Sequence, residues 1–373
     1  MANKPKVTLV EALHNIQDPR RPSNGTRHNF VEMLVIAVCA MLSDCDNIED
    51  IGDWAVDKES WLRQFLVLKN GIPSEETFLR LFRALDPKQF ETAYRRWVGA
   101  LVPVLRGAVA IDGKTLRGSR DGEVGPVHIV TAFATQSGIA LGQEKVAAKS
   151  NEITAIPELL DALYVKGCIV TIDAMGCQTA IAAKIVDKKG DYLLTVKNNQ
   201  PSLMASIEDA FLRERPALPA HVVEQTGHGR NVIQTVWAMP AAGIVDPAVW
   251  AKVKTLGMIY SERREGNKAC QPEVRFYISS RKLSAPSLAK YARAHWGIEN
   301  QLHWVLDVTF DEDASTVRKD NAPENLSLLK KIALCLLRTQ REAHPRYSLR
   351  RMRKHAARDD DFLADMLQLI PLQ

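Results

Sequence analysis

The spacing of apolar residues divides this 373-residue chain into segments with two different periods. Between residues 30 and 98, apolar positions recur three and four residues apart, which predicts amphipathic helices. Turn signals interrupt the pattern at 43–47 and 70–73, and Ser74 followed by two glutamates is typical of a helix start. We therefore expect residues 1–100 to form a small all-helical domain.

After residue 98 the apolar runs become shorter and strand-like, and only the later ones are separated by helical patterns, at 156–163 and 179–186. Three strands that can form hairpins, followed by a strand, a helix and a strand, predict a mixed sheet covered by helices, which is an α/β fold. The expected strands are 108–112, 128–134, 139–146, 168–173 and 192–197.

The segment at about 214–282 alternates between apolar and polar residues without a sustained helical period, so we expect a β-rich insertion there. Helical patterns return at 287–304 and at 321–338. The organisation predicted from these patterns is a main α/β domain over 101–340 that contains the insertion, followed by a helical tail over 341–373.

The composition is that of an ordinary globular protein, with 46% hydrophobic and 25% charged residues. Its six cysteines are scattered and lack zinc-binding spacing, so we expect reduced core residues of a cytoplasmic protein. The longest apolar stretch, 33–42, is too short to span a bilayer, and residues 1–18 lack the apolar core of a signal peptide. These features predict a protein without a membrane segment.

A formal net charge of +5 is compatible with a polyanionic partner, and basic residues concentrate in two places. Residues 18–22 form a short basic arm bounded by prolines, and the helices that follow it either bind DNA or cap the main domain. In the tail, residues 341–358 hold seven Lys or Arg residues against one acid, Glu342. That segment is expected to be either a solvated helix or a helix that contacts phosphates.

Asp112 and Asp173 each stand at the end of a short apolar run, in AVAIDGK and CIVTIDAMG. Burying a carboxylate is costly unless a cation or hydrogen bonds compensate it, so two in matched contexts indicate a shared cation site. Either aspartate alone would be more typical of a strand-end turn. Strand alternation places Lys114 on the same side as Asp112, where it could meet a phosphate, and Gly113 allows a close approach of other groups.

A third acid, Glu299, lies in a predicted helix with His295 and His303 four residues away on either side. This spacing differs from the His-Glu-x-x-His of zinc enzymes, and no third soft ligand accompanies it. With the two aspartates, Glu299 would complete an oxygen-rich site for Mg²⁺ of the kind used in phosphodiester cleavage. The acids at 307–313 lack the spacing of a calcium loop and are expected to form a solvated turn or to pair with Arg318.

Nine segments spread over nearly the whole chain are typical of one protein family. They are GIP at 71–73, AIDGKTLRGS, SNEITAIPELLDAL, TIDAMGCQ, YLLTVKNNQP, GHGR, VRFYISS, HWGIENQLHWVLDVTFDED and NAPENL. In these segments the chain resembles transposases of bacterial insertion sequences, specifically the ISAs group that includes the H-repeat-associated proteins. The resemblance implies an Asp-Asp-Glu triad on a ribonuclease-H-like fold, with the β-rich insertion placed before the glutamate helix.

By this resemblance Asp112, Asp173 and Glu299 are the catalytic residues and metal ligands, with two Mg²⁺ ions that Mn²⁺ could replace and no nucleotide cofactor. The family's reaction is metal-assisted hydrolysis at the ends of the mobile element, followed by attack of the freed 3′ hydroxyl on target DNA. The expected partner is therefore double-stranded DNA, bound by a homodimer.

The resemblance also implies candidate DNA contacts. Related transposases carry a tyrosine, an arginine and a lysine around the third acid, but Ala292, His295 and Leu306 stand at these positions here. In this helix His295 and the nearby Arg293 are the candidates. Elsewhere the candidates are Lys114, Arg117, Lys197, Asn199, Gln200, His228 and Arg230.

Two other functions stay open at this point. One is a transposase-derived protein that binds DNA without cutting it, against which the intact triad argues. The other is a nuclease that hydrolyses DNA but cannot join strands.

Overall fold

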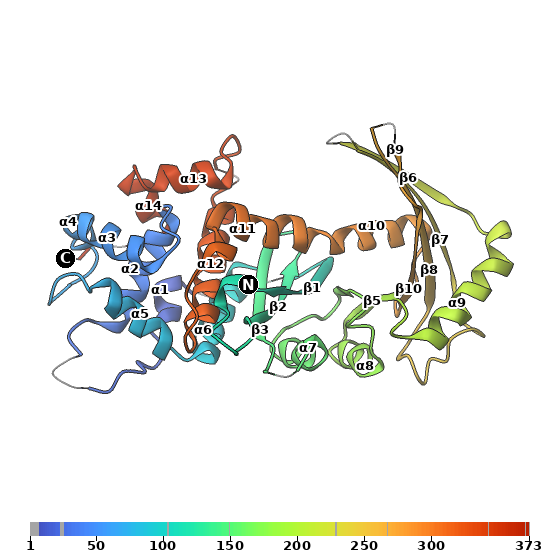
Figure 1. Ribbon diagram of the computed structural model, residues 1–373, viewed down its shortest axis with the longest axis horizontal. Helices are drawn as coiled ribbons and strands as arrows, with labels where there is room; N and C mark the ends of the chain where they lie inside the picture. The colour runs from blue at the N-terminus through green and yellow to red at the C-terminus, as the bar shows by residue number, and fades with distance from the viewer. Residues whose placement is uncertain are drawn as a thin grey trace, which may run out of the picture.

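The computed structural model describes residues 7–22, 26–102, 104–148, 150–227, 230–266, 268–341, 343–369 and 371–372. Helices gather at one end of the molecule, a sheet covered by helices lies in the centre, and a β-rich arm extends to the other end (Figure 1). None of the helices in the described part of the chain combines the length and apolar character needed to span a bilayer.

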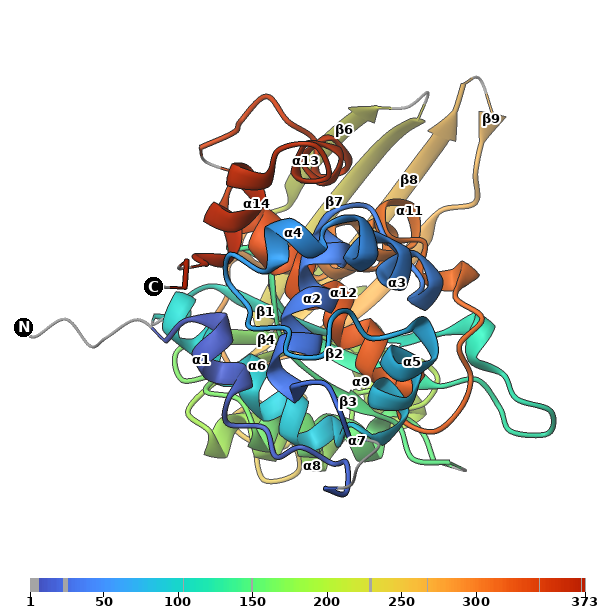
Figure 2. The same cartoon turned by 90° about the vertical axis from the view of Figure 1, so that its left-hand side faces the viewer.

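The helical end is built from both termini of the chain. Helix α2 (Phe30–Leu42) is almost entirely buried, and the C-terminal helix α14 (Asp360–Leu367) packs against it, as does α12 (Ala322–Thr339). Figure 2 shows these helices from their own side, with α13 (Leu349–Ala356) beside α14. The N-terminal helices are α1 (Leu9–Leu13), α2 (Phe30–Leu42), α3 (Ile48–Asp57), α4 (Glu59–Leu62), α5 (Glu75–Ala84) and α6 (Pro87–Leu101). The predicted helical region is thus confirmed, and the tail is part of it.

Arg353 explains why the tail packs on the N-terminal helices. Its side chain has no exposed surface, and it donates hydrogen bonds from Nη2 to Met41 O at 2.9 Å and to Asp46 Oδ1 at 2.8 Å. A buried guanidinium with a paired carboxylate and a carbonyl acceptor is a structural contact. This arginine of the basic tail is therefore neither solvated nor available to a phosphate. The other six Lys and Arg residues of 341–358 are exposed, which leaves both expectations open for the rest of the segment.

The central sheet contains the five strands predicted from the sequence. Strands β1, β2 and β3 form an antiparallel meander, and β4 and β5 continue the sheet parallel to β1. Helices α7 (Glu152–Asp161) and α8 (Thr179–Asp187) lie below the sheet in Figure 1, and α10 (Ala285–His295) and α11 (Trp304–Phe310) lie above it. The strands are β1 (Ala108–Thr115), β2 (His128–Ala134), β3 (Ile139–Lys145), β4 (Ile169–Ile172) and β5 (Asp191–Val196). The predicted mixed α/β fold is confirmed.

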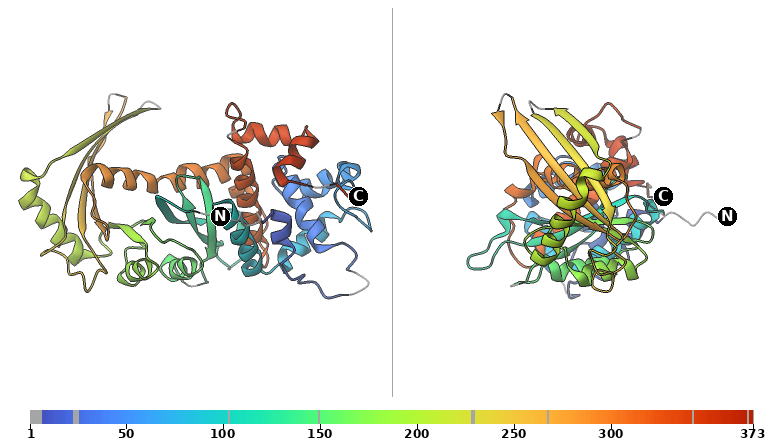
Figure 3. Two further views of the ribbon diagram at one scale, coloured as in Figure 1. Left: turned by 180° about the vertical axis from the view of Figure 1, so that it is seen from behind. Right: turned by 90° about the vertical axis from the view of Figure 1, so that its right-hand side faces the viewer.

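The β-rich insertion continues the same sheet instead of forming a separate one. Strand β10 pairs antiparallel with β5, and the strand order is β3-β2-β1-β4-β5-β10-β8-β7-β6, with β9 paired to β8. Figure 3 shows the long twisted strands of this arm from behind and from its end. The helix α9 (Pro201–Glu214) that precedes the arm was not predicted. The strands are β6 (His221–Gly227), β7 (Arg230–Pro240), β8 (Thr255–Glu265), β9 (Lys268–Ala269) and β10 (Glu273–Ser279).

The last long helix of the central part, α12 (Ala322–Thr339), holds the helical end against the sheet. It packs against α2, α5 and α6 on one side and against β3 on the other. A further link is the hydroxyl of Tyr94 on α6, which donates to Ala140 O on β3 at 2.6 Å. Between β10 and α12 run α10 (Ala285–His295), the π-helical turn η3 (Glu299–His303) and α11 (Trp304–Phe310). Short 3-10 turns are η1 (Arg117–Ser119), η2 (Arg215–Ala217) and η4 (Glu312–Ala314).

All six cysteines are free thiols, and five of them are buried. Cys270, beside the short strand β9, is half-buried. The cysteines therefore serve as packing residues, as their scattered positions in apolar runs predicted.

Candidate active site

The two aspartates are brought together by the register of the central sheet. Ile111 on β1 lies opposite Ile172 on the neighbouring parallel strand β4, and this is the last registered pair. Asp112 and Asp173 are the next residues on the two strands, and adjacent strands lie about 5 Å apart. Their matched sequence contexts therefore correspond to neighbouring positions at the same edge of the sheet.

Glu299 lies on the helical segment that crosses one face of the sheet at this edge. Helices α10 and α11 and the π-helical turn η3 between them run as one rod over the sheet (Figure 1). The π-helical turn holds both Glu299 and His303. One-turn π-helices are rare and are frequent at functional sites, because they change which side chains face a neighbour.

The carboxylates of Asp112 and Glu299 meet across the imidazole of His303. One ligand atom of each of these three residues lies within 4.8 Å of the others. His303 Nδ1 is 2.9 Å from Glu299 Oε2 and 3.6 Å from Asp112 Oδ2. The imidazole is buried, and its other nitrogen, Nε2, has no hydrogen-bond partner among the described residues. Sequence reasoning had noted His303 only as part of a helical stripe, and its spacing of four from Glu299 was the signal of this contact.

The acids of the site lack a full counter-charge. The pKa of Asp112 is raised to about 6, mainly by burial and also by the acids Glu152 and Asp173, while His303 acts to lower it. The hydrogen bond with His303 instead lowers the pKa of Glu299, and this acid is also more exposed. The imidazole therefore compensates Glu299 better than Asp112, which agrees with the two distances.

Asp173 lines the same pocket but turns toward its own loop. Its Oδ1 accepts hydrogen bonds from the backbone N–H of Met175 at 3.0 Å and of Gly176 at 3.4 Å. Such a turn is common for an aspartate at a strand end. Asp173 is therefore a strand-end turn residue that also lines the pocket with the other two acids, and its role as a metal ligand stays a prediction.

Two predicted DNA contacts hold this loop in place. Asn199 Nδ2 donates to Ala174 O at 2.6 Å, and Gln200 Nε2 donates to Cys177 O at 2.9 Å. The side chains therefore connect the end of β5 to the loop that follows Asp173. Their role as DNA contacts stays a prediction, while their packing on the loop is a feature of the fold.

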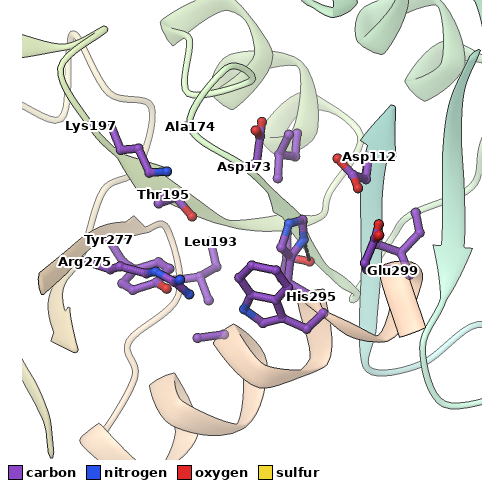
Figure 4. A pocket seen from close by; sticks show the side chains of 15 residues that line it. Asp112, Asp173, Ala174, Leu193, Thr195, Lys197, Arg275, Tyr277, His295 and Glu299 are labelled. Carbon is purple, nitrogen blue, oxygen red and sulfur yellow. Dashed lines mark hydrogen bonds between the residues drawn. The ribbon is translucent and has the colours of Figure 1, made fainter. Parts of the chain in front are cut away.

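A pocket of about 310 Å³ adjoins the acids. Figure 4 shows Asp112, Asp173 and Glu299 toward one end, and Lys197, Arg275 and Tyr277 toward the other. Acids at one end of a pocket can hold divalent cations, which bind a phosphate group of a substrate. Basic residues at the other end can attract further phosphates of the same substrate. The pocket therefore suits a substrate with several phosphate groups.

The basic and aromatic groups of this pocket include residues that the sequence analysis did not select. Arg275 lies on β10, 5.0 Å from the centre of the Trp296 ring, and pairs with Glu273 at 2.7 Å. Tyr277 follows two positions later and faces the same pocket. The sequence VRFYIS could have indicated that Arg275 and Tyr277 lie together, because residues two apart on a strand share a face.

His295 lines the pocket from the helix side. Its Nδ1 lies 3.2 Å from Thr171 Oγ1, and burial lowers its pKa, which favours the neutral imidazole. This contact fixes α10 against β4. Arg293, two residues earlier, lines a second hollow on the far side of Trp296 together with Arg275. The DNA contacts of His295 and Arg293 stay predictions.

Lys114 does not point toward the pocket. Its ammonium contacts Asp307, lies 2.7 Å from Glu312 Oε2 and lies 3.3 Å from Asp313 Oδ1. The expectation that this acidic turn is solvated or paired with Arg318 is therefore wrong for these three acids. The DNA contact predicted for Lys114 is not favoured by this geometry, because its donors already face carboxylates.

The remaining predicted DNA contacts lie at separate places on the molecule. Arg117 is 82% exposed and lies 3.4 Å from Asp313 Oδ2, so it is accessible to a large partner. Arg230 begins β7 at the tip of the hairpin with β6, 3.3 Å from Glu265. Lys197 lines the pocket. His228 lies outside the described residues.

Gly113 is required by a pair of side chains on the face of β1 opposite Asp112. A Cβ at this position would lie 2.1 Å from Glu152 Oε1 and 2.4 Å from His128 Nε2. These two side chains contact each other at 2.7 Å, and Thr115 Oγ1 lies 2.8 Å from His128 Nδ1. Gly113 therefore allows the close approach of two side chains of the protein, Glu152 and His128.

The donor set of the site fits a divalent cation that prefers oxygen ligands. Asp112 and Asp173 supply carboxylates from adjacent strands, and Glu299 supplies a third from the helix. The raised pKa of Asp112 indicates that the charge of this half-buried carboxylate is not fully compensated by the protein alone. Mg²⁺ takes oxygen ligands and commonly uses a few protein carboxylates while leaving positions for water and substrate.

Comparisons with known proteins decide the family. Residues 105–336 match the family described as "Transposase DDE domain", and residues 10–98 match one described as "DDE_Tnp_1-associated". The chain belongs to the DDE transposase family. The first match covers the central sheet and all three acids, and the second covers most of the N-terminal helices.

Named relatives of this transposase chain agree. A putative transposase, YncI, of Escherichia coli O157:H7 is 36% identical over 96% of this chain and 94% of its own length. The H repeat-associated putative transposase YhhI of Escherichia coli strain K12 is 37% identical over 96% of this chain and 97% of its own length. The resemblance to H-repeat-associated transposases is thus confirmed.

A solved structure also aligns with the chain. It is a piggyBac transposase synaptic complex with hairpin DNA, with 11% identity, a TM-score of 0.45 and coverage of 97% of this chain and 77% of that chain. At this distance we draw no conclusion from it.

Proposed function

We propose that this DDE transposase is active, and that Asp112, Asp173 and Glu299 bind two Mg²⁺ ions for cutting the ends of its mobile element and joining them to target DNA. The observation that carries the proposal is the meeting of Asp112, Glu299 and His303 within 4.8 Å, with Asp173 on the adjacent strand. Three carboxylates from two strands and one helix are a donor set that suits metal-assisted phosphodiester chemistry.

When bound, two such ions activate the attacking oxygen and stabilise the leaving oxygen of a phosphodiester. The protein's own contribution is to hold the ligands and to orient DNA. His303 keeps the Glu299 carboxylate within 2.9 Å of its Nδ1 and beside Asp112, which preserves the spacing of the two acids. The turn after Asp173 holds the third carboxylate at the same edge of the sheet.

Lys197 and Arg275 at the other end of the pocket are the residues we propose to meet the DNA backbone. Both are cations in a pocket whose opposite end carries the acids, so they would draw the phosphates that flank the cut bond toward the site. We further propose that two copies of the chain each hold one end of the element, which makes the DNA complex a homodimer.

The proposal is tested with double-stranded DNA that carries the repeats flanking the gene of this protein, in Mg²⁺ and in Mn²⁺. Asp112→Asn, Asp173→Asn and Glu299→Gln should each reduce cleavage below about a thousandth of the wild-type rate, a loss of about 4 kcal/mol of transition-state stabilisation, with DNA binding retained. The control is Asp53→Asn, on the exposed side of α3.

Cleavage at the wild-type rate in any one of the three variants would exclude that residue as a ligand. DNA binding by the wild-type protein without cleavage in either metal would favour the inactive DNA-binding protein. Pre-cleaved ends separate the remaining alternative, because a nuclease without joining activity would leave them unjoined to target DNA.

A further inference from the structure

The contacts of Lys114 have no place in the function proposed so far. Its side chain is only 13% exposed, and its ammonium contacts Asp307, Glu312 and Asp313. An ammonium group has three N–H donors, and three carboxylates accept them here. Burial lowers the pKa of Lys114, but the facing carboxylate of Glu312 and its neighbours more than offset this and raise it overall, so the lysine stays charged.

These contacts join the two elements that carry metal ligands. Lys114 follows Asp112 by two residues on β1, so the two side chains share a face of the strand. Asp307 follows Glu299 by eight residues on the same helical rod. Lys114 therefore ties the strand of one ligand to the helix of another, next to the point where the ligands themselves meet.

The acids that hold Lys114 are themselves fixed to the core. Glu312 is 3% exposed, and its other oxygen, Oε1, accepts from Ser327 Oγ on α12 at 2.8 Å. Lys331 Nζ donates to Ser327 Oγ and to Gln143 Oε1 on β3, each at 2.8 Å. A chain of hydrogen bonds thus runs from β1 through η4 to α12 and back to β3.

We propose that Lys114 is a positioning residue that sets the separation between Asp112 and Glu299, so that the cation site is formed before metal and DNA arrive. The inference rests on the proposed function. The need for such a tie follows from charge, since Asp112, Asp173 and Glu299 repel one another whenever no cation lies between them. His303 offsets part of this repulsion at the site, and Lys114 holds the same strand and helix together beyond it.

The test compares Lys114→Gln with Lys166→Gln, an exposed lysine at the opposite end of the sheet, before β4. The full-length protein is titrated with Mn²⁺ without DNA, and the free ion is followed by electron paramagnetic resonance. We expect Lys114→Gln to weaken Mn²⁺ binding by about 10- to 100-fold, the range for removing partners that orient metal ligands, and Lys166→Gln to leave it unchanged.

DNA binding distinguishes this role from the phosphate contact predicted from the sequence. If Lys114 is a positioning residue, Lys114→Gln keeps the wild-type DNA affinity in metal-free buffer and the wild-type dependence of that affinity on salt. If Lys114 binds a phosphate instead, Lys114→Gln weakens DNA binding and reduces the slope of log K against log salt by about one. Weaker DNA binding with a reduced salt slope, together with unchanged Mn²⁺ affinity, in Lys114→Gln would overturn the inference.

Asp307→Asn tests the same tie in case Lys114→Gln does not fold. This change keeps the shape of the side chain, removes one charge from the more exposed end of the cluster and leaves Glu312 in place. A smaller weakening of Mn²⁺ binding, of at least about threefold, is expected, since outer partners of this kind contribute up to about 100-fold. Unchanged Mn²⁺ affinity in folded Asp307→Asn would contradict the proposal.

The result also separates this inference from the proposed function. If the wild-type protein binds Mn²⁺ but does not cut DNA, the function fails and the effect of Lys114→Gln on Mn²⁺ still decides the positioning role. If the wild-type protein cuts DNA and Lys114→Gln retains the wild-type Mn²⁺ affinity, only the positioning role fails.

Discussion

The carboxylate of Asp173 is bound to its own turn, whereas that of Asp112 faces the helix of Glu299. The loop after Asp173 is in turn tied to Asn199, whose Nδ2 donates to Ala174 O at 2.6 Å. At the residue scale, Asp173 is therefore positioned by its own turn and, through the loop, by Asn199, so a change at Asn199 should affect cleavage more than DNA binding.

Asn199→Ala tests this for Asp173. Without the hydrogen bond to Ala174 O the loop is held less firmly, so we expect the cleavage rate to fall roughly tenfold while DNA affinity stays within about twofold of the wild type. Cleavage assays and equilibrium binding to the same DNA provide the measurement, with the adjacent exposed Asn198→Ala as the control. A large drop in DNA affinity in Asn199→Ala alone would instead support the contact predicted from the sequence.

At the element scale, the contact between helix α6 and strand β3 contains a buried acid. Glu91 Oε1 accepts from the backbone N–H of Gln143 at 2.8 Å, and the side chain is almost fully buried. Burial is the main reason that the pKa of Glu91 rises to about 7. The folded protein therefore binds this proton more tightly than the unfolded chain, in which a glutamate has its ordinary pKa.

This raised pKa predicts a pH dependence of stability. The contribution of Glu91 is fully present below the ordinary pKa of glutamate and is lost as pH rises through about 7, which corresponds to about 3 kcal/mol of unfolding free energy. Glu91→Gln keeps the acceptor oxygen and should lose less stability than the wild type between pH 4.5 and pH 8. Urea unfolding across this range measures it, with exposed Glu208→Gln on α9 as the control. A wild-type slope in Glu91→Gln would contradict the assignment.

A second element-scale contact joins helix α13 of the tail to α2. Arg353→Met would leave the half-buried Asp46 and the buried carbonyl of Met41 without their partner. Removing one member of a buried ion pair costs about 3–5 kcal/mol, so a large drop in stability is expected in denaturant unfolding. Lys354→Met, on the exposed side of the same helix, should cost less than about 0.5 kcal/mol. Equal effects of the two changes would show that the tail is held by other contacts.

At the scale of the whole molecule, the site lies between the helical end and the β-rich arm, and both extend beyond it (Figure 1). One hydrogen-bonded sheet runs from the acids into the arm through the pairing of β5 with β10. Arg230 at the tip of the β6–β7 hairpin and Arg117 near the site are separate basic positions that a long duplex could contact at once. Such an extended surface suits DNA better than a small ligand.

The proposed dimer is tested at this scale. Glu299→Gln protein, which should bind DNA without cutting it, is mixed with duplexes that carry one element end, and the mass of the complex is measured by light scattering after size exclusion. Two chains and two duplexes are the expected composition. The control is a duplex of the same length without the repeat. A complex of one chain with one duplex at all protein concentrations would contradict the dimer.

The local pattern of the sequence determined a large part of this structure. The change from helical to strand-like period placed the five central strands, because side-chain period follows directly from backbone geometry. Asp112 and Asp173 were recognisable because a carboxylate directly after an apolar strand run is costly to bury unless a cation or hydrogen bonds compensate its charge. Glu299 and the family were recognisable from segments long enough to be specific to DDE transposases.

The tertiary structure alone decided which groups these side chains meet. Lys114 shared a strand face with Asp112, yet its partners stand about 200 positions further along the chain, at Asp307 and Glu312. Asn199 likewise meets a carbonyl 25 residues away, and Arg353 meets one more than 300 residues away. Local periodicity states which way a side chain faces, whereas its partner depends on packing between distant elements. The three acids that line the pocket could thus be selected from the sequence, but the contacts that position them could not.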